Sequence, residues 1–139
     1  MKLNTLIPEL CCSDFETTRK FYIDILGFEI LYERPEEGFA MLNYQGSHLM
    51  IDEIPEGGSR WETATMDPPY GRGINLQIDT DDANFLASKI KNAGWPLFME
   101  IEEKWYRMND IEVGNRQFLV QDQDGYLLRF AQDLGDRSL

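Results

Sequence analysis

The stretch RQFLVQDQDGYLLRF, residues 116–130, predicts two apolar-rich strands joined by a turn at Asp124-Gly125. A similar hairpin occurs earlier in the chain, where residues 39–42 and 49–52 flank a turn at Gly46. We interpret the two hairpins as matching parts of two copies of one structural unit.

Each copy also contains a helix that ends at a glycine. The first helix begins at the sequence SDFE, residues 13–16, which matches a capping box, and it ends at Gly27. The second covers residues 82–93 and ends at Gly94. A strand, a helix and a small meander cannot close a core alone, so we expect the two copies to curl their sheets together around a groove.

These patterns predict an α+β fold in one domain, residues 1–139. The first module covers residues 4–54, with strands expected at 4–11, 28–34, 39–44 and 48–54. A connector, residues 55–72, is rich in Pro, Gly, Ser and acidic residues and could be a lid or a crossover. The second module covers residues 73–133 and opens with a strand at 74–78. Its charged segment, residues 97–112, is expected to be a long loop over the groove.

The composition limits the partners. Lys and Arg total 13 against 25 Asp and Glu, which gives a net charge of −12. This field repels nucleic acid and anionic lipid and would attract a cationic small molecule, although acidity also simply keeps proteins in solution. The sequence shows no signal peptide and no long apolar stretch, so we expect no membrane partner and a cytoplasmic location. Cys11 and Cys12 are adjacent and are expected to be packed thiols.

The sequence offers no catalytic pair. The single histidine, His48, falls on a hairpin turn, so neither a Ser-His nor a Cys-His pair is credible. A carboxylate base, Glu9 or Asp52, remains possible if burial raises its pKa. We therefore predict no catalytic residue of the nucleophilic kind and favour binding over catalysis.

Several motifs together resemble the vicinal oxygen chelate superfamily, which includes glyoxalases, bleomycin resistance proteins and dioxygenases. They are residues 13–15 (SDF), 21–22 (FY), 26–28 (LGF) and 116–128 (RQFLVQDQDGYLL), and the resemblance extends over residues 4–133. Gln123 stands where the family usually has a proline. Among the branches, the chain is most similar to bleomycin resistance proteins. The resemblance implies two βαβββ modules whose curled mixed sheets form a cup.

Many members of this superfamily hold a divalent metal in the cup on four ligands. The resemblance places those four positions at Ile7, Asp52, Gly73 and Arg129, of which only Asp52 can bind a metal. A guanidinium at the fourth position would put a permanent cation where the metal should lie. We therefore expect no metal and no other cofactor. Asp52 and Arg129 could instead pair across the floor of the cup.

The residues expected to bind a ligand come from two sources. Strand alternation, counted from the vacated metal positions, selects side chains that face the cup. Aromatic and acidic residues on the hairpin, the connector and the charged segment are expected at its rim. The full set is Phe39, Met50, Asp52, Trp61, Asn75, Gln77, Trp105, Tyr106, Glu112 and Arg129.

The resemblance implies a metal-free protein that sequesters a cationic or aromatic small molecule, such as a bleomycin-type antibiotic, without changing it. It also implies a homodimer and a role in antibiotic resistance. Two alternatives stay open. One is a metal-dependent lyase, isomerase or dioxygenase of the same superfamily, and the other is a sensor or partner module whose cup is vestigial.

Overall fold

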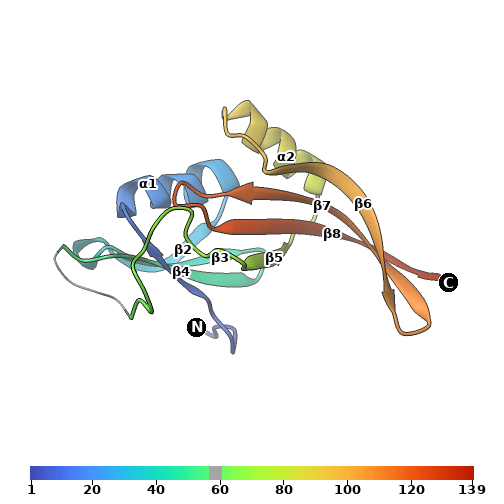
Figure 1. The fold of residues 1–139 in the computed structure, drawn as a ribbon, viewed down its shortest axis with the longest axis horizontal. Coiled ribbons are helices and arrows are strands. Elements are labelled where there is room, and N and C mark those ends of the chain that lie inside the picture. The colour runs from blue at the N-terminus through green and yellow to red at the C-terminus, as the bar shows by residue number, and fades with distance from the viewer. Residues whose placement is uncertain (57–60) are drawn as a thin grey trace. The chain divides into compact units, whose positions relative to one another are not determined.

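The computed structural model describes residues 1–56 and 61–139, which form two units (Figure 1). Unit 1 contains residues 1–72 together with the segment Asp122–Tyr126, and unit 2 contains residues 73–121 and 127–139. Each unit has the order strand, helix, then three strands. This confirms the α+β class and the two βαβββ modules that the repeat predicts.

Unit 1 is a four-stranded mixed sheet with helices on one face. Its strands have the order β1-β4-β3-β2, with β1 parallel to β4 and the other neighbours antiparallel. The π-helix η1 continues α1, and η2 is a short 3-10 helix. The elements are β1 (Glu9–Cys12), α1 (Phe15–Lys20), η1 (Phe21–Leu26), β2 (Glu29–Arg34), η2 (Pro35–Glu37), β3 (Phe39–Tyr44) and β4 (Ser47–Glu53).

The core of unit 1 is built from aromatic rings of α1, η1 and the sheet. Tyr22 is fully buried, and its ring meets Phe21 and Phe28 edge to face at 5.2 and 5.3 Å between ring centres. Phe28 in turn lies 5.1 Å from Tyr44 on β3. Such ring pairs add about 0.5–1.5 kcal/mol each to the burial of their apolar surface. The helical layer is thereby fixed to one face of the sheet.

Unit 2 repeats this plan with longer strands. Its sheet has the order β5-β8-β7-β6, and α2 packs on β6, β7 and β8 through buried residues that include Leu86 and Ile90. Phe118 and Phe130 face each other across β7 and β8 and stack at 5.6 Å. The elements are β5 (Asn75–Asp79), α2 (Ala83–Asn92), β6 (Met99–Met108), β7 (Ile111–Gln121) and β8 (Leu127–Ser138).

The predicted capping box at residues 13–16 is wrong, because the Ser13 N–H and hydroxyl, which the box would use, both donate to Asp124. Asp14 is the N-cap, and no side-chain bond caps α1 from there. The Ser13 hydroxyl donates to Asp124 Oδ1 at 2.5 Å, and the Phe15 N–H donates to Glu53 Oε2 at 2.7 Å. The predicted end of this helix is confirmed, since Gly27 adopts φ 90°, which a side chain would strain.

Two other expectations need correction. Residues 97–112 are not a loop: β6 and β7 form a long hairpin around Asn109-Asp110, with the Arg116 guanidinium 2.7 Å from Glu103 across the strands. The first strand is also shorter than residues 4–11. Its ladder begins at Glu9 because Pro8 has no N–H to donate, and Asn4 bonds to the turn of the β3–β4 hairpin through His48 Nδ1 and the Gly46 carbonyl.

The turn Asp122–Tyr126 joins β7 to β8 but packs in unit 1. The Asp122 carboxylate accepts the backbone N–H groups of Asp124, Gly125 and Tyr126 at 3.0–3.1 Å, and it accepts the Tyr22 hydroxyl at 2.9 Å. One carboxylate thus fixes the shape of the turn and ties it to the core of unit 1.

Three further contacts hold this turn. Asp124 accepts the backbone N–H and the hydroxyl of Ser13, and the Tyr126 hydroxyl donates to the Cys11 carbonyl at 2.9 Å. The Gln123 side chain donates to the Thr18 hydroxyl. The glutamine that replaces the family's usual proline is therefore used as a donor.

No helix within residues 1–56 or 61–139 is long and apolar enough to cross a membrane.

The buried Asp122 predicts a pH-dependent contribution to stability. Burial raises its pKa from the ordinary 3.8 to about 6, although the Tyr22 hydroxyl and the backbone N–H groups act in the opposite direction. Between these two pH values the folded chain holds a proton that the unfolded chain has lost. The free energy of unfolding should therefore fall by up to about 3 kcal/mol as pH rises through this window.

Asp122→Asn should remove this pH dependence while keeping an oxygen for the backbone N–H groups. Urea unfolding of both proteins from pH 4 to 7 measures it, with the exposed Asp136→Asn as the matched control. Equal slopes for the native chain and Asp122→Asn would contradict the assignment.

Candidate functional site

One face of the unit 1 sheet carries an aromatic and thioether surface around a carboxylate. Strand register places Phe39 on β3 opposite Asp52 on β4, and Met41 opposite Met50 in the next row. Tyr32 on β2 lies opposite Met41. Directly opposed residues of an antiparallel pair point to the same face. We call these five residues the aromatic face of unit 1.

Phe39 already holds a cation. The Arg34 guanidinium carbon lies 4.2 Å from the centre of the Phe39 ring, and the Tyr32 ring lies 6.0 Å away at an angle of 34°. Arg34 is also paired with Glu37 at 2.6 Å, and its side chain is 45 % exposed. The Phe39 ring itself is only 6 % exposed, so most of its surface is already covered, in part by the Arg34 guanidinium.

The corresponding face of the unit 2 sheet is polar. Arg129 on β8 donates from Nη2 to the Gln77 side-chain oxygen on β5 at 2.7 Å, and Asn75 lies one row along. Gln117 on β7, which is 3 % exposed, donates to Glu102 Oε1 at 3.1 Å and to the Tyr106 hydroxyl at 2.6 Å. We call Asn75, Gln77, Gln117 and Arg129 the polar face of unit 2.

Trp105 has a role within the fold. A Cβ atom at Gly114 would lie 2.6–2.8 Å from three atoms of its ring, so the ring lies flat on that glycine. The Arg137 guanidinium carbon lies over the ring at 4.1 Å and is paired with Glu112 at 2.9 Å. Trp105 and Glu112 are thus engaged with the end of β8, which leaves little ring surface for a ligand.

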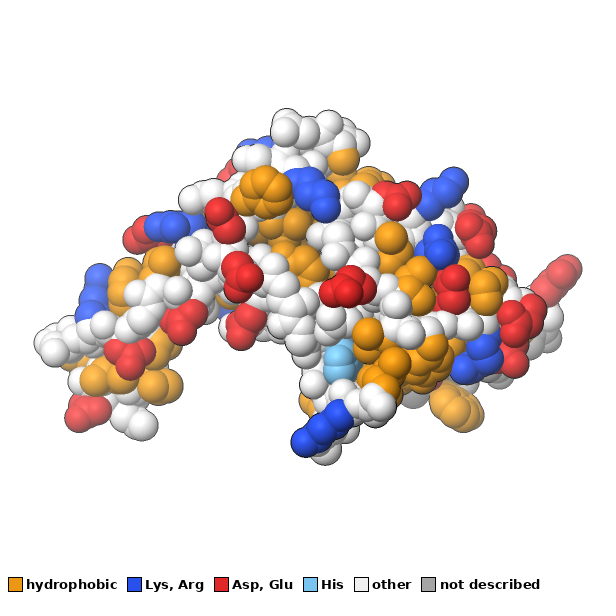
Figure 2. Space-filling model, turned by 180° about the vertical axis from the view of Figure 1, so that it is seen from behind, with side chains coloured by type: hydrophobic (Ala, Val, Ile, Leu, Met, Phe, Trp, Pro, Cys, Tyr) orange, Lys and Arg blue, Asp and Glu red, His pale blue; other side chains and the backbone are white. Residues whose placement is uncertain are grey.

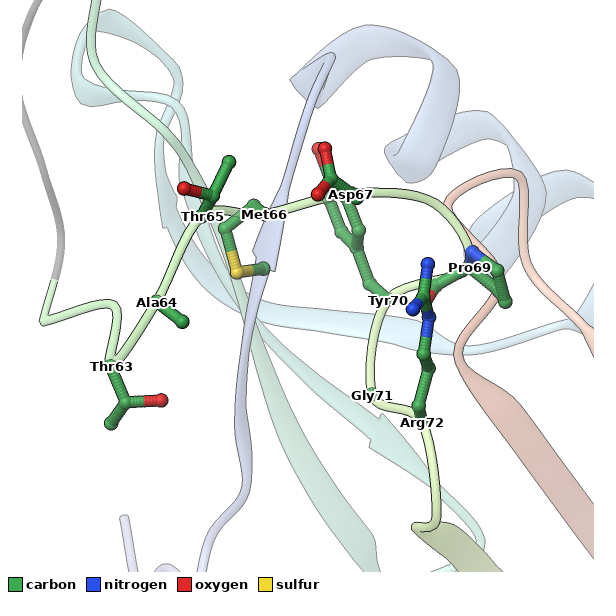
Figure 3. A pocket seen from close by; sticks show the side chains of 9 residues that line it. All are labelled: Thr63, Ala64, Thr65, Met66, Asp67, Pro69, Tyr70, Gly71 and Arg72. Atoms are coloured by element: carbon green, nitrogen blue, oxygen red, sulfur yellow. The ribbon is translucent and has the colours of Figure 1, made fainter.

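The connector forms a hollow of about 390 Å³ in unit 1. In Figure 3, residues 63–65 lie on one side of it and Pro69, Gly71 and Arg72 on the other. Arg72 donates to the carbonyls of Pro68 and Pro69, which holds its guanidinium on its own loop. Trp61 at the start of this segment is 92 % exposed.

The predicted site residues therefore fall into separate groups. Phe39, Met50 and Asp52 share the aromatic face of unit 1, and Asn75, Gln77 and Arg129 share the polar face of unit 2. Tyr106 joins the second group through Gln117. Asp52 and Arg129 belong to different units, and their pairing stays a prediction.

Sequence reasoning missed three residues of these faces. Met41 lies two residues after Phe39 on β3, Tyr32 lies opposite Met41 on β2, and Gln117 lies two residues before Leu119, the cross-strand partner of Arg129. Counting in twos along each strand would have found all three.

The donor set does not fit a divalent metal. Ile7 and Gly73 have no lone pair in their side chains, and Arg129 is a cation, so Asp52 alone of the four expected positions could ligate. Among the residues that the structure describes, no group of three or more His, Cys, Asp or Glu side chains could hold a metal ion.

On the face shown in Figure 2, acidic side chains are spread out and not gathered in one patch. Figure 2 shows them on the face in view, with Lys and Arg side chains between them. Several basic residues are paired locally, including Arg19 with Glu33 and Lys91 with Glu100. The net charge of −12 therefore acts as a general field.

Residues 3–130 match the family model of the glyoxalase/bleomycin resistance protein/dioxygenase superfamily. The chain belongs to this superfamily. A bleomycin resistance protein of Geobacillus stearothermophilus is 26 % identical over 137 residues, which cover 92 % of this chain and 96 % of that protein. The homology to bleomycin resistance proteins is thus distant but spans nearly the whole molecule.

Two solved structures are among those similar to this chain. A superfamily member from Vibrio splendidus 12B01 is 35 % identical and covers 90 % of this chain and 95 % of its own, with a TM-score of 0.41. A protein of unknown function from Agrobacterium tumefaciens str. C58 has a TM-score of 0.72 at 21 % identity, covering 96 % of this chain and 97 % of its own. The second match shows the fold, which confirms the glyoxalase/bleomycin resistance architecture predicted from the motifs.

The close approach of Trp105 to Gly114 predicts a costly substitution. Gly114→Ala would push a methyl group into the ring, and we expect a loss of about 1–3 kcal/mol in the free energy of unfolding. In a Trp105→Ala background the same methyl group meets no ring, so most of the loss should disappear. Urea unfolding of the four proteins in this double-mutant cycle measures the coupling. Additive losses would show that the two residues do not depend on each other.

Proposed function

We propose that the protein binds a cationic or aromatic small molecule, such as a bleomycin-type antibiotic, and sequesters it without chemical change. The observation that supports this most is the match to bleomycin resistance proteins along 92 % of the chain. In this proposal the protein acts in antibiotic resistance, in the cytoplasm, and as a homodimer.

The aromatic face of unit 1 supplies suitable chemistry. Tyr32, which is 39 % exposed, offers a flat ring, and the half-buried Met50 offers an adaptable apolar contact. Phe39, Met41 and the Asp52 carboxylate are on the same face but are at most 6 % exposed. The net charge of −12 adds a field that raises the local concentration of a cation. Trp61 and Tyr106 are proposed as further contacts because their rings are partly or fully exposed.

Affinity requires several of these contacts together. A stacking or cation–π contact contributes about 0.5–2 kcal/mol, while micromolar binding needs about 8 kcal/mol. A homodimer would help because each cleft could take contacts from both copies. Oligomerisation is therefore part of the proposal.

The side chains with shifted pKa values favour binding over catalysis. Burial raises the pKa of the Cys12 thiol to about 12, so it stays protonated and is a poor nucleophile. Asp122, with its raised pKa, is engaged in the turn that it shapes. His48 Nδ1 accepts the Asn4 N–H. Each of these groups has a role in the fold.

Titration with bleomycin, with and without copper, tests the proposal. We expect saturable quenching of tryptophan fluorescence and a rise in melting temperature. Phe39→Ala should weaken binding about tenfold, because one ring contact and its packing are lost. Phe85→Ala is the matched control, since that ring is 69 % exposed on α2 and far along the chain from β3.

Two results would contradict the proposal. If neither form of bleomycin quenches fluorescence or raises the melting temperature, the proposal that the ligand is a bleomycin-type antibiotic must be withdrawn. If elemental analysis after gentle purification finds stoichiometric nickel, zinc, iron or manganese, a metal-dependent lyase, isomerase or dioxygenase becomes the better hypothesis for the function.

A further inference from the structure

We propose that the polar face of unit 2 is a binding subsite for an oxyanion, a carboxylate or a phosphate, centred on Arg129. The inference goes beyond the proposed function, because it concerns an anionic group and rests on residues of unit 2 alone.

Among the described residues of unit 2, Arg129 forms no ion pair, whereas Arg116 and Arg137 of the same unit do. Four arginines form ion pairs with a glutamate, at N–O distances between 2.6 and 3.0 Å: Arg19, Arg34, Arg116 and Arg137. No carboxylate of unit 2, among the described residues, is within ion-pair distance of Arg129. With 25 Asp and Glu in the chain, a shortage of acidic residues does not explain this.

The surroundings of Arg129 on the sheet are neutral. Its cross-strand neighbours are Gln77 on β5 and Leu119 on β7, and its neighbours along β8 on the same face are Leu127 and Ala131. The acidic residues of this face, Asp79 and Glu102, lie in the adjacent row, opposite Ala131 and Gln117. The positive charge of Arg129 is therefore not neutralised by its cross-strand neighbours, Gln77 and Leu119.

The guanidinium is held in one orientation. Its Nη2 donates to the Gln77 oxygen at 2.7 Å, while its Nε–H is shielded from water and has no acceptor. A cation that has lost part of its hydration interacts more strongly with an added anion. Arginine also presents its N–H groups as a planar fork that matches a carboxylate or phosphate. A fixed, partly dehydrated guanidinium is thus prepared for a planar anionic group.

A second buried polar group on this face also lacks a partner. Gln117 is diagonal to Arg129 across β7 and β8, it is 3 % exposed, and its side-chain oxygen is shielded from water without a donor. Buried polar atoms in native proteins nearly always have a partner. A hydroxyl or N–H of the bound molecule would supply one. The ligand class is therefore an oxyanion with a hydrogen-bond donor nearby.

The stability of an Arg129 variant separates a binding role from a structural one. Replacing a shielded cation by a neutral side chain is neutral or stabilising when the charge serves no structural purpose. Arg129→Gln should therefore melt at the same temperature as the native chain or higher. A strongly lowered melting temperature would make Arg129 a structural residue and would overturn the proposal.

Binding is tested by titrating the ¹⁵N-labelled full chain with sodium benzoate, with salicylate, and with inorganic phosphate at constant ionic strength. We expect saturable shifts of backbone amides around Gln77 and Arg129 on β5 and β8, with the preferred probe distinguishing a carboxylate from a phosphate. Salicylate carries a hydroxyl donor beside its carboxylate and should bind more tightly than benzoate. Arg129→Gln should weaken binding at least about tenfold.

Two variants act as controls. Gln77→Ala keeps the charge but frees the guanidinium, so it should weaken binding about threefold. Arg107→Gln removes an exposed arginine of β6 and should leave binding unchanged. The proposal fails if the shifts equal those produced by sodium chloride, or if Arg129→Gln binds the probes as the native chain does. Because none of these probes is a cation, failure here leaves the bleomycin titration as an independent test.

Discussion

The carboxylate of Asp122 is the constraint on which the rest of the structure depends. It accepts three backbone N–H groups of its own turn and the hydroxyl of Tyr22 from the core of unit 1. The turn that joins β7 to β8, the two central strands of unit 2, is therefore fixed within the other unit. The turn is thus part of unit 1, although the strands on either side of it belong to unit 2.

In each βαβββ unit, the two faces of the sheet have different surroundings. One face is covered by a helix, and its side chains form the core. These side chains must be apolar and must pack closely. The opposite faces of the two sheets carry different side chains. Unit 1 carries rings and methionines beside Asp52, whereas unit 2 carries amides around Arg129.

Much of the fold could be predicted because its signals are local. Strand β3 was predicted at its observed bounds, and Gly27 ends its helix as expected, since alternation and a left-handed glycine depend on neighbours in sequence. Strand alternation placed Gln77 and Arg129 on one face, but their hydrogen bond was not predicted. Other features depended on distant partners. The Ser13 hydroxyl bonds to Asp124 and does not form the predicted capping box. The Trp105 ring is covered by Arg137, which lies 32 positions later in the chain. No local sequence pattern indicates either contact.

The position of the Asp122–Tyr126 turn also bears on the order of assembly. During synthesis, residues 1–72 leave the ribosome before the turn Asp122–Tyr126 is made. Until then, the Tyr22 hydroxyl and the Ser13 N–H lack their acceptors, which are Asp122 and Asp124. The first module is completed only when most of the second has emerged. The first module therefore lacks part of its own structure until the later turn is made, and it is not expected to fold fully on its own.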